Sequence, residues 1–256
     1  MTGLITQLTA LSGLGEAYLW SAFLVFLRVG ALMALLPAFG EQSIPTRVRL
    51  VLTLAFTAVV APAVSGVAPP GSLGPAGAEV VAGLALGIGL RLFVMALQMA
   101  GAIAAQATSL AQLFGGAGPE PQPAFGNLLV MAGLALAVMQ GLHVRAAELM
   151  IRSYDVLPLG RLPDVSDMGG WGLLQVATAF SLAFTLAMPF VIAALIYNVA
   201  LGIINRAMPQ LMVSFIGAPA LTAGSLALMA VVVPLALGVW LIRFNGFLAA
   251  PFAVTP

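Results

Sequence analysis

Residues 168–205 read MGGWGLLQVATAFSLAFTLAMPFVIAALIYNVALGIIN, a run of 38 residues without a charged side chain. Residues 207–242 form a second uncharged run, of 36 residues. Backbone groups inside lipid must form hydrogen bonds within their own element, which leaves helices or closed barrels. Neither run alternates polar and apolar residues as the strands of a barrel do. The two runs therefore predict membrane-type α-helices.

The rest of the chain has the same character. Hydrophobic residues make up 62% of the 256 positions and charged residues 7%, with a mean hydropathy of +1.12, whereas a soluble domain carries about 25% charged residues. Short breaks rich in Pro and Gly separate six apolar segments, at about 11–39, 48–64, 79–114, 124–154, 170–207 and 209–244. We expect a single-domain (residues 1–256), all-α membrane protein of about six long hydrophobic helices or helical hairpins, partly broken, with Pro189 and Pro234 kinking or dividing the last two.

The last two segments are too long for simple membrane spans. At about 1.5 Å per residue each would extend well over 50 Å, against a hydrocarbon core of roughly 30 Å. The arginines also divide almost evenly between alternate loops, so the positive-inside rule indicates no orientation. We therefore expect part of the apolar surface to pack on protein. Gly83 and Gly87 form a G-x-x-x-G pair, which would let another helix approach closely.

Four arginines lie within or at the ends of apolar segments: Arg28, Arg91, Arg145 and Arg206. A charge near the centre of a bilayer costs roughly 2.5–3.5 kcal/mol on insertion scales. Each of these arginines therefore needs a partner, a water-filled cavity or a shallow depth. The alternative is that some of them lie near helix ends and extend to the membrane interface.

The segment 112–123 reads QLFGGAGPEPQP, and residues 115–123 contain three glycines and three prolines. Glycine gives the backbone freedom and proline prevents continuation of a helix. The flanking Phe114 and Phe125 could fill a narrow opening. One interpretation is a flexible surface loop, and the other is irregular backbone that lines or closes a cavity at membrane depth.

The residues do not favour an enzyme, a metal site or a cofactor. His143 is the one histidine, no cysteine is present, and neither H-E-x-x-H nor G-x-S-x-G occurs. The net charge of +1 provides no basic patch for nucleic acid. We expect no catalytic residue, no bound cofactor or metal ion, and no nucleic-acid partner.

Three groups of short motifs resemble the FliR family of type III secretion export-apparatus subunits, in the same order and at similar spacing. They are FLRVG (26–30), LPAFG (36–40) and IPTRVR (44–49); QGLH (140–143) and LPLG (157–160); and GIINRAMPQL (202–211) followed by FIG (215–217). The resemblance covers most of the chain, and the N-R-x-x-P-Q block is its most specific part.

The resemblance implies a structural subunit of the bacterial flagellar export gate. A single FliR-like copy assembles with several FliP-like and several FliQ-like subunits into a conical channel for unfolded flagellar proteins. The implied location is the bacterial inner membrane at the flagellar basal body, with part of the assembly on the periplasmic side. Membrane lipid and other export-apparatus membrane proteins would be further partners.

The resemblance also implies roles for particular residues. The loop between the third and fourth segments would help to plug the closed channel: Phe114, Gly115, Gly116, Gly118, Pro119, Glu120, Pro121, Pro123 and Phe125. Candidate contacts between helices or subunits are Arg28, Arg47, Arg49, Arg91, Asn205, Arg206 and Gln210.

Two other readings stay open. The homologous subunit of a virulence injectisome would share the fold and the gate role. A small-solute secondary transporter would show paired carboxylates at the midplane or an inverted repeat, and we find neither in the sequence.

Overall fold

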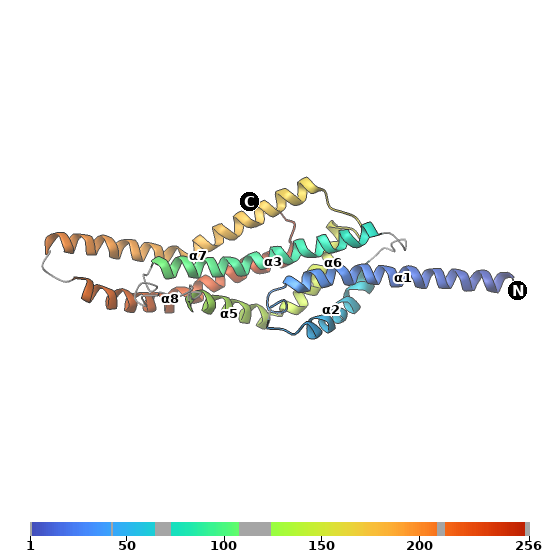
Figure 1. Cartoon of the computed structure of the whole chain (residues 1–256), viewed down its shortest axis with the longest axis horizontal. Coiled ribbons are helices and arrows are strands. Elements are labelled where there is room, and N and C mark those ends of the chain that lie inside the picture. The colour runs from blue at the N-terminus through green and yellow to red at the C-terminus, as the bar shows by residue number, and fades with distance from the viewer. Residues whose placement is uncertain (1, 42, 65–72, 108–123, 209–212, 254–256) are drawn as a thin grey trace. The chain divides into compact units, whose positions relative to one another are not determined.

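The computed structural model describes residues 2–41, 43–64, 73–107, 124–208 and 213–253, and within these ranges it contains helices and no strand. Figure 1 shows the helices in chain order. They are α1 (Thr2–Leu35), α2 (Thr46–Val60), the short 3-10 helix η1 (Ala61–Ala63), α3 (Leu73–Ala107), α5 (Ala124–Met139), α6 (Leu142–Val156), α7 (Val165–Ala207) and α8 (Val213–Ala249).

Five of the described helices are long and apolar enough to cross a membrane, or six if α5 and α6 together form one broken span. This confirms the expected all-α membrane fold. The fourth apolar segment, residues 124–154, is one of the broken ones, because it divides into two helices at residues 140–141. Gly141 precedes α6 with φ at 79°. That left-handed conformation suits glycine and ends a helix.

Of the two expected effects of Pro189 and Pro234, a kink or a division, the division does not occur. Helix α7 continues for 43 residues through Pro189, and α8 continues for 37 residues through Pro234. Proline removes one backbone hydrogen bond from a helix, and the helix continues on both sides of each proline. At about 1.5 Å per residue, α7 is roughly 64 Å long.

Asp164 provides the polar start of α7. Its carboxylate accepts hydrogen bonds from the hydroxyl of Ser166 (2.7 Å) and from the backbone N–H of Ser166 (2.8 Å). These bonds lower the pKa of Asp164, the hydroxyl having the larger effect. A lowered pKa means that the cap stabilises the helix above the carboxyl's unfolded pKa and is lost as the pH falls through its folded pKa.

The chain separates into two compact units. Unit 1 comprises Met1–Arg91, Gln140–Gln175 and Asn245–Pro256, and unit 2 comprises Leu92–Met139 and Val176–Phe244. Helices α3, α7 and α8 contribute residues to both units.

Unit 2 is built around a buried tryptophan. Trp240 of α8 is fully buried, stacks on Phe244 (ring centroids 4.8 Å apart) and donates its indole N–H to the carbonyl oxygen of Phe93 in α3 (2.9 Å). Helices α3 and α5 meet at two glycines, because a Cβ added to Gly101 would collide with the backbone of Gly126. The two glycines, which have no side chain, therefore allow the backbones of α3 and α5 to come into close contact, as small residues do in other membrane helices.

We expect Gly101→Ala to destabilise unit 2 by about 1–3 kcal/mol, because the added methyl group forces the two backbones apart. The matched control is Gly238→Ala in α8, where an added Cβ meets nothing within 4 Å. Thermal unfolding of the full chain in one detergent measures both. A Gly101→Ala variant that melts with the control would contradict the close contact.

Candidate functional site

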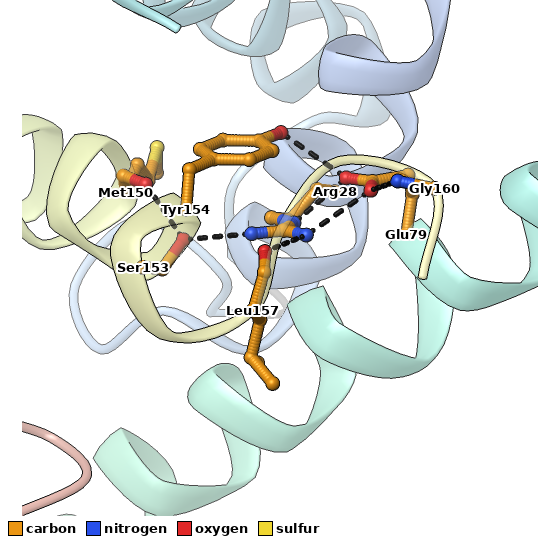
Figure 2. Close-up of polar contacts among 7 residues, drawn as sticks. All are labelled: Arg28, Glu79, Met150, Ser153, Tyr154, Leu157 and Gly160. Atoms are coloured by element: carbon orange, nitrogen blue, oxygen red, sulfur yellow. Dashed lines mark hydrogen bonds and ion pairs between the residues drawn. The ribbon is translucent and has the colours of Figure 1, made fainter. Parts of the chain in front are cut away.

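A buried ion pair lies at the centre of unit 1. Arg28 of α1 and Glu79 of α3 are both fully buried. The Nε of Arg28 donates to Oε2 of Glu79 (2.7 Å), and its Nη2 donates to Oε1 (3.0 Å) (Figure 2). This two-pronged geometry matches the planar guanidinium to the carboxylate and is among the stronger charge-assisted arrangements.

Helix α6 and the turn after it complete the surroundings of Arg28. The hydroxyl of Ser153 accepts a hydrogen bond from Nη1 (3.0 Å), and the carbonyl oxygen of Leu157 accepts one from Nη2 (2.9 Å). The ring of Tyr154 covers the guanidinium at 3.7 Å from its centroid, a cation–π contact that also shields the charge. Ser153 in turn donates to the carbonyl oxygen of Met150 (2.6 Å).

Glu79 accepts two further hydrogen bonds. The phenol of Tyr154 donates to Oε2 (3.1 Å) and the backbone N–H of Gly160 donates to Oε1 (2.8 Å) (Figure 2). Gly160 has φ at 73°, and an added Cβ would lie 3.0 Å from Pro75. The turn therefore needs glycine for both its conformation and its closeness to α3.

Small residues on α3 let α1 come close enough for this pair to form. A Cβ on Gly83 would collide with the backbone of Arg28, and one on Gly87 would lie 2.8 Å from the Cβ of Leu35. The G-x-x-x-G pair thus faces α1. The free-energy cost of removing two charges from water is offset only where their geometry is good and their remaining hydrogen-bonding groups are satisfied. The network around Arg28 and Glu79 meets that condition.

A second, half-exposed cluster holds the turn between α1 and α2. Nη1 of Arg91 pairs with Oε1 of Glu41 at 2.6 Å, with the two side chains 34% and 29% exposed. Arg49 donates to the carbonyl oxygens of Glu41 (3.1 Å) and Gly40 (3.5 Å). The turn contains Ala38 at φ 68°, which is unusual for a residue with a Cβ. Arginine contacts hold this strained turn in place.

The site residues predicted from the sequence differ in their surroundings. Arg28, Arg49 and Arg91 join separate elements within unit 1, whereas Arg47, Asn205 and Arg206 are exposed. Phe125 packs edge-on against Phe190 in unit 2, with ring centroids 5.1 Å apart. The remaining candidates lie outside the described residues: Phe114, Gly115, Gly116, Gly118, Pro119, Glu120, Pro121, Pro123 and Gln210.

Sequence reasoning did not identify Glu79, Ser153, Tyr154 and Gly160. Glu79 carried a usable clue, because it is the one carboxylate in residues 73–107 and such a group in apolar surroundings calls for a partner. Ser153 and Tyr154 carried none, since ordinary polar residues at a helix end have no distinctive spacing. Gly160 belongs to the LPLG motif (157–160), but the motif does not indicate its contact with Glu79.

The hydrogen bonds and the ion pair of this site link separate parts of unit 1. The two charged groups of the site, Arg28 and Glu79, form an ion pair with each other. The described residues contain no group of three or more His, Cys, Asp or Glu side chains able to hold a metal ion. The site joins α1, α3, α6 and the turn after α6.

Comparison with known proteins gives a consistent result. The sequence matches the family described as bacterial export proteins, family 1, over residues 19–247. It is 34% identical over 235 residues to the flagellar biosynthetic protein FliR of Caulobacter vibrioides, covering 89% of this chain and 94% of that protein. The FliR of Escherichia coli K12 is 30% identical over 228 residues, covering 85% and 84%. The FliR of Bacillus subtilis is 26% identical over 214 residues, covering 78% and 82%.

We expect Arg28→Met to cost about 3–5 kcal/mol of stability, because it leaves the carboxylate of Glu79 buried without a cation. The double variant Arg28→Met with Glu79→Gln should lose less than Arg28→Met alone, since no charge is then stranded. Thermal unfolding in detergent at neutral pH compares them.

Arg91→Met is the control for this experiment. It breaks a half-exposed ion pair, for which about 0–1 kcal/mol is expected. Equal melting temperatures for Arg28→Met and Arg91→Met would show that the buried pair is not the main constraint in unit 1.

Proposed function

The chain belongs to family 1 of the bacterial export proteins, and from that membership we propose that it is a structural subunit of the flagellar type III protein export gate. Its curated relatives are named flagellar biosynthetic proteins and align with it over most of both chains. This favours the flagellar system over a virulence injectisome. The role is that of a structural component and not of an enzyme.

Exposed apolar surface on α7 is the observation that carries the proposal. Within unit 2, large hydrophobic residues are exposed from Val176 (39%) through Leu195 (62%) and Ile203 (65%) to Ile204 (44%). From Val176 to Ile204 the helix rises roughly 42 Å, more than the ~30 Å of a hydrocarbon core. Lipid alone does not cover such a length, so part of this surface needs protein against it.

FliP-like and FliQ-like subunits are the proposed cover. In this arrangement one copy of the chain packs its long apolar helices against those of its partners, and the assembly encloses a channel for unfolded flagellar proteins. The proposed location is the bacterial inner membrane at the flagellar basal body, with part of the gate on the periplasmic side. The segment from Phe114 to Pro123 is proposed to plug the closed channel.

The direct test is affinity purification of the tagged chain in mild detergent, followed by mass spectrometry. We expect FliP-like and FliQ-like proteins in one large complex. Recovery of the chain alone as a stable, monodisperse protein would overturn the proposal, because a subunit that buries its apolar surface on partners should not be self-sufficient.

A substitution on α7 tests where the partners bind. We expect Ile203→Asp to lower the recovery of partner subunits more than tenfold, because an unpaired charge buried at an interface costs several kcal/mol. Leu162→Asp is the matched control, since Leu162 is 67% exposed and Ile203 is 65% exposed, and Leu162 lies in the loop before α7. Equal recovery from the two variants would place the interface elsewhere.

A further inference from the structure

Among the five single helices that could cross a membrane, α2 with the turn after it (Thr46–Ala63) has the smallest share of buried residues, 17%. Three of its 15 residues are buried, namely Thr53, Thr57 and Val60. The large apolar residues on its outer face are exposed by 48–64%: Val48, Leu50, Val51, Leu54 and Val59. The helix therefore packs on unit 1 through one narrow stripe and presents a continuous apolar surface outward.

The polar atoms of that stripe are already satisfied. The hydroxyl of Thr53 donates to the carbonyl oxygen of Arg49 (2.8 Å), and the hydroxyl of Thr57 donates to that of Thr53 (2.7 Å). Threonine uses such bonds to mask its hydroxyl where no water is available. The exposed residues between Val48 and Val59 are all apolar, so this part of the helix calls for an apolar medium.

Positive charge accumulates at the start of α2. Glu41 is the one acid in residues 17–78, and it is paired with Arg91. Arg49 is held by backbone carbonyl oxygens, which carry no net charge. Arg47 is exposed, and neither Arg47 nor Arg49 forms an ion pair with a carboxylate of the described residues. Among the described residues, these two guanidinium charges therefore have no carboxylate counter-ion.

The dimensions of α2 match one leaflet of a bilayer. From Val48 to Val59 the helix rises about 16 Å, and half of a ~30 Å hydrocarbon core is about 15 Å. Arg47 directly precedes this stretch, and Arg49, the one charged residue inside it, is half-buried and donates to backbone carbonyl oxygens of the preceding turn. When Val48–Val59 lies among acyl chains, Arg47 lies at the level of the headgroups.

We propose that Arg47 binds the phosphate of an anionic phospholipid whose acyl chains lie along the outer face of α2. Guanidinium matches phosphate with two parallel hydrogen bonds, and the uncompensated charge selects an anionic over a zwitterionic headgroup. The source is a lipid and not free phosphate, because the cation adjoins an exposed apolar face. This inference is independent of the proposed export role, since it concerns one helix and its lipid.

The test is native mass spectrometry of the full chain, with the subunits that co-purify, titrated with dioleoyl phosphatidylglycerol or dioleoyl phosphatidylcholine. We expect the anionic lipid to bind more tightly. Arg47→Gln should weaken its binding about fivefold, the factor that corresponds to about 1 kcal/mol per arginine near an anionic surface. Arg161→Gln is the control, because Arg161 is also an exposed arginine of unit 1 and lies in the loop before α7.

Three results would overturn the proposal. They are equal affinity for the two lipids, equal weakening by Arg47→Gln and Arg161→Gln, and complete competition by inorganic phosphate. A photo-crosslinking amino acid introduced at Val51 adds a fourth arm, in which crosslinks to lipid support the proposal and crosslinks to a protein subunit contradict it. The subunits recovered in the same sample report on the export gate separately.

Discussion

A charge pair removed from water is the constraint on which unit 1 depends. Once Arg28 and Glu79 are both fully buried, every remaining donor and acceptor near them must find a partner, because low polarity makes an unsatisfied group expensive. The partners come from a helix and a turn more than 120 residues beyond Arg28 along the chain. The pair therefore fixes the positions of α1, α3 and α6 together, which apolar contacts alone would leave free to slide.

Glycine has the complementary role in both units. Gly83 and Gly87 bring α1 onto α3 in unit 1, and Gly101 meets Gly126 in unit 2. Lipid removes the hydrophobic driving force between helices, so close backbone contact and internal hydrogen bonds must provide the specificity. Apolar surface that remains outside these contacts, on α7 above all, is available to protein partners, while the outer face of α2 suits lipid.

The helical fold was predictable from the sequence because its cause is local. A membrane permits helices or closed barrels, and long uncharged runs such as residues 168–205 lack the alternation of barrel strands. Two details were not predictable at the same level. The fourth segment divides at Gly141, whose φ of 79° depends on the course of the chain on both sides. Helix α7 continues through Pro189, although a proline can either kink or divide a helix.

For the candidate site, the sequence by itself determined that Arg28 and Arg91 each needed a partner, a water-filled cavity or a shallow depth, because an isolated charge in apolar surroundings is costly. Only the tertiary structure decided that these partners are Glu79 and Glu41, about 50 residues away. The physical reason lies in the helices themselves. A helix that is apolar on every side carries no stripe that marks its buried face, so pairing between such helices is settled by packing and not by pattern.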